Sequence, residues 1–133
     1  MSVDKWLIAL DIDGTVLHED GTLSDAVVQA IVRVRDAGHE VMLATGRSVA
    51  MTLPVLERLG LSPQYLVCSN GAITLERDPN VTTGYRREFV VTFDPSEVLT
   101  TIRANLESAN YAVEDEMGMY RYTGHFPDGT LGV

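Results

Sequence analysis

Two aspartates, Asp11 and Asp13, are the residues of this chain whose type and spacing point most directly to chemistry. They end an apolar run in the segment LDIDGTVL, directly before a glycine and a threonine. A folding core gains nothing from carboxylates at the tip of a buried strand, and two carboxylates this close repel each other unless a cation compensates. An oxygen-rich pair of this kind suits Mg²⁺. The alternative interpretation is an ordinary turn rich in Asp and Gly.

Two further apolar runs end in polar residues that could bind a ligand. The run EVMLAT leads into Thr45, Gly46 and Arg47, and the run QYLVCSN leads into Asn70 and Gly71. The alternatives are that Thr45 and Gly46 form an ordinary strand-to-helix turn and that Arg47 is a surface residue. Asn70 and Gly71 could likewise be a common turn pair. Polar residues end all three apolar runs. Together the three runs are stronger evidence for a binding site than any one of them alone.

These polar residues need strands that end at one edge of a sheet. Apolar runs and helical periodicity predict the order strand, helix, strand, helix, strand, which is typical of an α/β fold with right-handed crossovers and a parallel sheet. In such sheets ligands bind at the carboxyl ends of the strands. The expected elements cover residues 5–11, 24–38, 40–45, 48–59 and 64–70.

The pattern changes in the second half of the chain, which reads as a separate α+β piece. Asp94 and Glu97 form a capping signature at the start of an amphipathic helix. We therefore divide the chain into a core, residues 1–81, and a second part, residues 82–133. The expected elements of the later region are strands over 72–76, 85–93, 111–116 and 119–123 and a helix over 94–110.

Composition excludes several classes of partner. The chain has 133 residues and a formal net charge of −9, which argues against nucleic acid and against an anionic membrane surface. No apolar stretch approaches the length of a membrane span. The single cysteine, Cys68, lies in an apolar run and is interpreted as a buried hydrophobe, which fits a reducing cytoplasm.

Together the motifs resemble the haloacid dehalogenase (HAD) superfamily of phosphohydrolases. LDIDGTVL resembles the family's first motif, D-x-D-G-T after an apolar strand, and LATGR resembles the second. SNGA after the third strand resembles the type IIB (Cof-like) branch, mostly sugar-phosphate and related phosphatases. The resemblance implies a three-layer Rossmann-like core with an α/β cap. It also implies Mg²⁺-dependent hydrolysis of a small phosphate ester such as a sugar phosphate.

The resemblance assigns roles to the two aspartates. Asp11 would be the nucleophile that attacks phosphorus and forms an aspartyl-phosphate. Asp13 would be the general acid and then the base, so its pKa must differ from that of Asp11. Mg²⁺ would be held by the Asp11 carboxylate and the Asp13 backbone carbonyl.

The other two motifs would bind the substrate. The resemblance implies that Thr45 and the Gly46 amide hydrogen-bond the phosphoryl oxygens. Arg47 would help to hold the substrate, and Asn70 and Gly71 would line the same mouth. Phosphoryl transfer depends mainly on such positioning and charge compensation.

The chain departs from the family pattern in two respects. The family has a lysine after the cap, whereas the one lysine here is Lys5, ahead of the first strand. The family also has a further acidic motif after the cap, and none of the acids after residue 91 lies in such a pattern. We therefore expect this sequence to be an N-terminal portion whose activity alone is impaired. The free side of the first strand would be an unpaired apolar edge, which predicts self-association.

Two rival functions follow from the same residues. A phosphomutase of the same superfamily would use the same aspartates. A non-catalytic module that binds a phosphorylated metabolite or a partner protein would keep the mouth without turnover.

Overall fold

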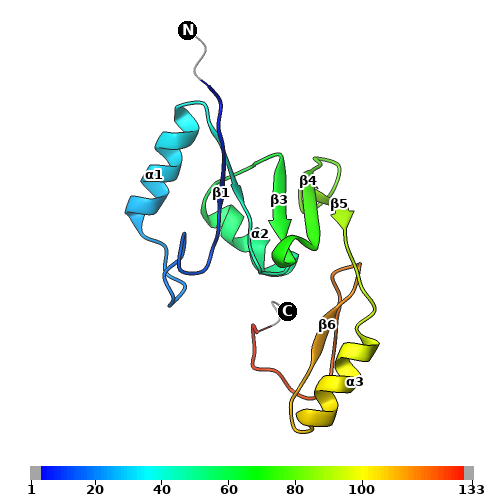
Figure 1. Ribbon diagram of the computed structural model, residues 1–133. Coiled ribbons are helices and arrows are strands. Elements are labelled where there is room, and N and C mark those ends of the chain that lie inside the picture. The colour runs from blue at the N-terminus through cyan, green and yellow to red at the C-terminus, as the bar shows by residue number, and fades with distance from the viewer. Residues whose placement is uncertain (1–3, 131–133) are drawn as a thin grey trace.

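The core is built on short parallel strands. In the computed structural model, which describes residues 4–130, β1 (Leu7–Leu10) pairs in parallel with β2 (Glu40–Leu43). A parallel bridge between Ala44 and Val67 joins the end of β2 to β3 (Tyr65–Cys68). Figure 1 shows how the helices connect these strands. The expected Rossmann-like α/β core is confirmed.

Both crossovers are helices whose starts are encoded locally. α1 (Asp25–Asp36) begins after Ser24, and α2 (Val49–Arg58) begins after Ser48. Each serine hydroxyl accepts a hydrogen bond from the backbone N–H three residues further on, at 3.3 and 3.4 Å respectively. These are N-caps, which satisfy donors that the first helical turn leaves free. α2 begins five residues before Pro54, which therefore lies inside the helix.

The hydrophobic core lies between the two helices and one face of the sheet. Side chains of a strand point alternately to its two faces, and Leu43, Leu66 and Cys68 reach the core and are 0% exposed. Cys68 is therefore the buried hydrophobe that the sequence predicts. The helices contribute Ile31, Val55 and Leu56, with Val27, Val34, Val49 and Leu53 partly buried beside them.

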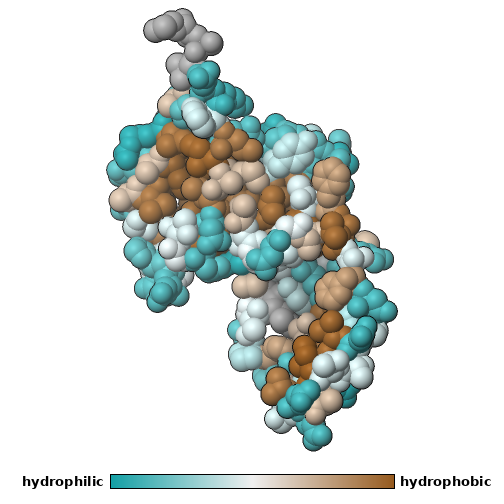
Figure 2. Space-filling model, in the orientation of Figure 1, coloured by the Kyte–Doolittle hydropathy of each residue, from teal (hydrophilic) through white to brown (hydrophobic). Residues whose placement is uncertain are grey.

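The other face of the sheet is open. Trp6 and Leu7 are 65% and 61% exposed, and β1 pairs only with β2 within the described part of the chain. The continuous apolar run of residues 5–11 predicts a strand that is buried on both faces. This prediction is wrong, because α1 and α2 pack in the same core cluster and leave the alternate side chains of β1 uncovered. Figure 2 shows apolar surface gathered over β1 and α1.

An antiparallel hairpin extends the sheet beyond β3. A turn, η1 (Ser69–Gly71), leads from β3 into β4 (Ile73–Arg77), which pairs with β3 and then with β5 (Tyr85–Val90). The strands expected over 72–76 and 85–93 are therefore present and pair with each other. Residue 82 lies in the loop between β4 and β5, and a division of the chain there stays a prediction.

The C-terminal part has regular elements but little core of its own. The helix α3 (Ser96–Asn105) is followed by β6 (Ala112–Glu114) and β7 (Tyr120–Tyr122), which pair antiparallel. Asp94 accepts hydrogen bonds from the Ser96 N–H and hydroxyl, as a cap would, at 3.0 and 2.6 Å.

The apolar face of α3 is not buried. The helix ends at Asn105, five residues before the expected end, and Val98 and Leu106 are 50% and 57% exposed. Two strands of three residues are too small a surface to cover it. In Figure 2 this part of the molecule shows apolar side chains at its surface. Within residues 4–130 no helix has the length and apolar character needed to cross a membrane.

Candidate active site

A tight loop after β1 presents the two aspartates. The Ile12 carbonyl accepts the N–H groups of residues 15–17 at 2.9–3.2 Å, and the Ile12 side chain is fully buried. Gly14 takes a φ of 72°, which favours glycine. With Ile12 anchored inward, Asp11 and Asp13 on either side of it are exposed at the carboxyl end of the strand.

Asp11 is free of any cationic partner among the described residues. Its Oδ2 accepts a long hydrogen bond, 3.4 Å, from the Thr15 hydroxyl. That contact fixes the loop but leaves most of the carboxylate's lone pairs available to a ligand.

Asp13 forms a bidentate ion pair with Arg47. Arg47 Nε donates to Asp13 Oδ2 at 2.9 Å, and Nη2 donates to Oδ1 at 2.7 Å. The hydrogen bonds from Arg47, together with its charge, lower the pKa of Asp13 against a smaller opposing effect of burial. Asp13 is thus held ionised here, although a general acid must be protonated. The spacing of 34 residues gave no sign of this pair.

The loop after β2 is ordered by its own threonine. Thr45 is buried, its hydroxyl accepts the Arg47 N–H at 3.1 Å, and its N–H donates to the Val67 carbonyl at 2.9 Å. Gly46 faces Asn70 closely, because a Cβ at position 46 would lie 2.9 Å from Asn70 Oδ1. The second and third motifs therefore meet at this point.

The turn after β3 has an unusual backbone. Ser69 and Asn70 take φ values of 49° and 54°, the left-handed region, and Gly71 follows at 93°. The Ser69 N–H donates to the Arg47 carbonyl at 2.8 Å, and the Asn70 N–H donates to the Thr45 carbonyl at 3.1 Å. These bonds tie the turn to the loop after β2.

One residue of this region was missed by sequence reasoning. Ser69 Oγ donates to Glu114 Oε2 at 2.8 Å, and Glu114 lies at the end of β6. The two residues are 45 positions apart, and no spacing or motif links them.

The seven predicted site residues thus form linked groups. Asp13 contacts Arg47, and Thr45 and Gly46 meet Asn70, with Gly71 next to it. Within residues 4–130 no hydrogen bond joins Asp11 to these groups, and its place beside them follows from its position two residues before Asp13.

The residues present fit Mg²⁺ as part of a site. Mg²⁺ takes oxygen ligands and usually keeps several waters, often with one or two carboxylates and substrate phosphate. Asp11 offers a carboxylate without a cationic partner. The described residues contain no group of three or more acidic, histidine or cysteine side chains that could hold a metal.

The sole lysine lies at the wrong end of the sheet. Lys5 Nζ is 3.4 Å from Glu40 Oε2, at the amino ends of β1 and β2. Asp11 follows the carboxyl end of β1, so Lys5 does not serve the candidate site.

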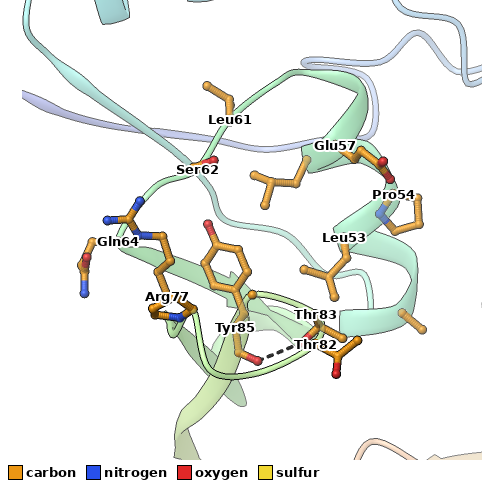
Figure 3. Close-up of a pocket in the computed structure, with 14 residues that line it drawn as sticks. Leu53, Pro54, Glu57, Leu61, Ser62, Gln64, Arg77, Thr82, Thr83 and Tyr85 are labelled. Atoms are coloured by element: carbon orange, nitrogen blue, oxygen red, sulfur yellow. Dashed lines mark hydrogen bonds between the residues drawn. The ribbon is translucent and has the colours of Figure 1, made fainter.

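A cavity away from the candidate site contains none of the predicted site residues. Its volume is about 890 Å³, and it lies between α2 and the segments next to β3 and β4 (Figure 3). Tyr85 stands in it with its hydroxyl donating to the Pro63 carbonyl at 2.7 Å. Because Ser62 and Gln64 precede β3, this cavity is at the amino end of that strand, away from the candidate site.

The fold is therefore a Rossmann-like α/β core with polar loops meeting at the carboxyl ends of its strands. A family model described as haloacid dehalogenase-like hydrolase matches residues 8–126, and this chain belongs to that family. The resemblance to its type IIB branch is confirmed.

Similar proteins are phosphatases. Pyridoxal phosphate phosphatase YbhA of Escherichia coli is 29% identical over 126 residues, 90% of this chain and 43% of that protein. The Bacillus subtilis protein YitU, 5-amino-6-(5-phospho-D-ribitylamino)uracil phosphatase, is 38% identical over 72 residues, 54% of this chain and 26% of that protein. The chain therefore spans less than half the length of either relative.

Solved structures agree on the fold. A phosphatase of the superfamily from Bacteroides thetaiotaomicron superposes with a TM-score of 0.62 at 25% identity, over 92% of this chain and 42% of that one. A subclass IIB sugar phosphatase superposes with a TM-score of 0.66 at 20% identity, over 90% of this chain and 44% of that one.

Proposed function

We propose that this chain carries the nucleophile and phosphate-binding loops of a Mg²⁺-dependent phosphohydrolase that acts on a small phosphorylated metabolite. The observation that carries the proposal is the meeting of the loops after β2 and β3, with Arg47 reaching from one of them to the aspartate loop. Phosphatases of the family support the substrate class, since the two relatives described above act on small phosphate esters by name.

Asp11 is the proposed nucleophile. Its carboxylate is exposed and has no cationic partner among the described residues, so an oxygen of Asp11 can attack phosphorus while the ester oxygen leaves. The product of that step is an aspartyl-phosphate on Asp11, which water then hydrolyses. Members of the family generally use Mg²⁺, which when bound offsets the repulsion between a carboxylate and a phosphate dianion.

Asp13 is the proposed proton donor to the leaving oxygen. The Arg47 pair opposes that role, because it favours the ionised carboxylate. A substrate phosphate competes for the same guanidinium, and bidentate binding of phosphate by arginine is common. Transfer of Arg47 from Asp13 to the phosphate removes the interaction that keeps Asp13 ionised.

The loop residues are proposed to hold the phosphoryl group. Thr45 and the Gly46 N–H would donate to its oxygens, with Asn70 and Gly71 beside them. The Arg47 N–H is already used by the Thr45 hydroxyl, so Arg47 contributes its side chain and not its backbone.

The test is hydrolysis of p-nitrophenyl phosphate with and without Mg²⁺. We expect slow, Mg²⁺-dependent release of nitrophenol that Asp11→Asn abolishes. The matched control is Asp36→Asn, a change of the same type at the exposed end of α1, which should leave the rate unchanged. Turnover that survives Asp11→Asn would reject the proposed nucleophile.

The place of the lysine favours a second function. Because Lys5 pairs with Glu40 at the other end of the sheet and does not serve the candidate site, the chain would on this proposal bind a phosphorylated metabolite without turnover. Mg²⁺-dependent binding of the ester, measured by calorimetry in the absence of hydrolysis, would support it. Phosphoryl transfer to a second sugar hydroxyl would instead indicate a mutase.

A further inference from the structure

Glu114 connects the C-terminal hairpin to the candidate site. Its Oε2 accepts a hydrogen bond of 2.8 Å from the Ser69 hydroxyl, and both side chains are partly buried. Glu114 is the last residue of β6, and Figure 1 shows β6 below the turn that follows β3. A charge-assisted bond in partly buried surroundings is among the stronger hydrogen bonds of a protein.

The hairpin that carries Glu114 is held in place at a second point. Arg87 of β5 donates through Nη2 to the Met117 carbonyl in the turn between β6 and β7. Glu114 is therefore supported from the β5 side and is not a side chain that reaches out from a free hairpin.

The turn that Ser69 begins needs support. Ser69 and Asn70 both have a positive φ, and non-glycine residues occupy that region at a cost that the surroundings must offset. Two backbone bonds to the carbonyls of Thr45 and Arg47 supply part of the support. The bond from Ser69 to Glu114 fixes the side chain of the first residue in the turn.

The conformation of the turn decides where Asn70 lies. Asn70 Oδ1 occupies the space that a Cβ on Gly46 would need, so the amide is packed against the loop proposed to bind phosphate. Relaxation of the turn would move this amide away from Gly46.

We propose that Glu114 is a positioning residue of the candidate site: through Ser69 it holds the left-handed turn that keeps Asn70 against Gly46. This rests on the proposed function in so far as the loop with Gly46 binds phosphate. The C-terminal hairpin would thereby fix the conformation of the loop after β2, which is proposed to bind phosphate, without contacting the phosphate itself.

The test compares four single variants of the full chain and the double variant Ser69→Ala/Glu114→Ala. Glu114→Ala and Ser69→Ala each remove the bond from one side, and Glu114→Gln keeps an acceptor oxygen for the Ser69 hydroxyl. Glu116→Ala is the matched control, an exposed acid two residues away. The first readout is the NMR signals and amide exchange of Asn70 and Gly46 in the free protein, and the second is titration with inorganic phosphate.

We expect Glu114→Ala and Ser69→Ala to speed exchange at Asn70 and to weaken phosphate binding alike, by about fivefold, the effect of one lost hydrogen bond. The double variant should add little to either change. Glu114→Gln should restore most of the wild-type behaviour, and Glu116→Ala should match the wild type.

Unchanged signals of Asn70 and Gly46 in both alanine variants would overturn the inference, as would the same changes in Glu116→Ala. If Glu114→Ala fails to fold by circular dichroism, Ser69→Ala carries the comparison. If the alanine variants change the signals of Asn70 and Gly46 but the wild-type chain binds no phosphate, the positional link is supported and the proposed function is rejected.

Discussion

The guanidinium of Arg47 holds both carboxylate oxygens of Asp13, at 2.7 and 2.9 Å, across the gap between the loops after β1 and β2. The pair occupies the two groups that the proposed reaction needs most, a cation for phosphate and a proton donor for the leaving group. It therefore describes a state of the site before substrate, and it gives the first prediction.

Arg47→Ala should free Asp13 and weaken substrate binding. Because Arg47 lowers the pKa of Asp13, its removal should shift the carboxyl titration of Asp13 by NMR to higher pH. Affinity for a phosphate ester should fall by about tenfold or more, as expected for loss of a charged hydrogen-bonding group. Arg33→Ala, an exposed arginine of α1, should change neither. An unshifted titration of Asp13 in Arg47→Ala would contradict the pairing.

Gly46→Ala should affect binding more than stability. The added Cβ would meet the Asn70 side chain at 2.9 Å, and a side-chain amide can move aside more easily than backbone. The free energy of unfolding should change by less than about 1 kcal/mol, while phosphate affinity should fall about threefold or more.

A double variant separates this effect from a change in the loop itself. If Asn70 is the group displaced, Gly46→Ala should have little further effect in an Asn70→Ala background. Equal and additive effects of the two substitutions on phosphate affinity would show that the displaced group is not Asn70.

Cys68 should react slowly with thiol reagents in the folded protein. It is 0% exposed, and burial raises the pKa of its thiol, so the reactive thiolate is scarce at pH 8. Modification by a maleimide should become fast only in denaturant. Equal rates in the folded and unfolded protein would argue against the core position of this residue.

The edge strand should promote self-association. β1 pairs only with β2 within the described residues, and Trp6 and Leu7 beside that edge are largely exposed. Leu7→Arg should lower the average mass measured by light scattering. Leu106→Arg, at a similarly exposed leucine directly after α3, is the control. A monodisperse monomer before any substitution would reject the prediction.

Local signals explain what the sequence predicted well. The serine caps of α1 and α2 act over three residues, and the apolar runs of β1, β2 and β3 are continuous, so both features are visible in short windows of sequence. The polar loops at the strand ends follow from the alternation of strands and helices. The family motifs also lie at these strand ends, so they too can be found in short windows of sequence.

Contacts between distant residues explain what the sequence did not predict. The Asp13–Arg47 pair, the left-handed turn at Ser69 and the bond to Glu114 depend on which strand ends face each other in space. The first strand reads as a buried one because its residues are apolar, yet burial requires a covering layer that its own sequence does not encode. The apolar side chains of α3 are exposed for the same reason.

The most direct test of the proposed role of Asp11 is to look for its phosphorylated form. The chain would be mixed with p-nitrophenyl phosphate and Mg²⁺, quenched in acid and mapped by peptide mass spectrometry. We expect a phosphoryl group on Asp11 that is absent without Mg²⁺ and in Asp11→Asn. A phosphoryl group on another residue, or none on a folded chain that binds the ester, would contradict it.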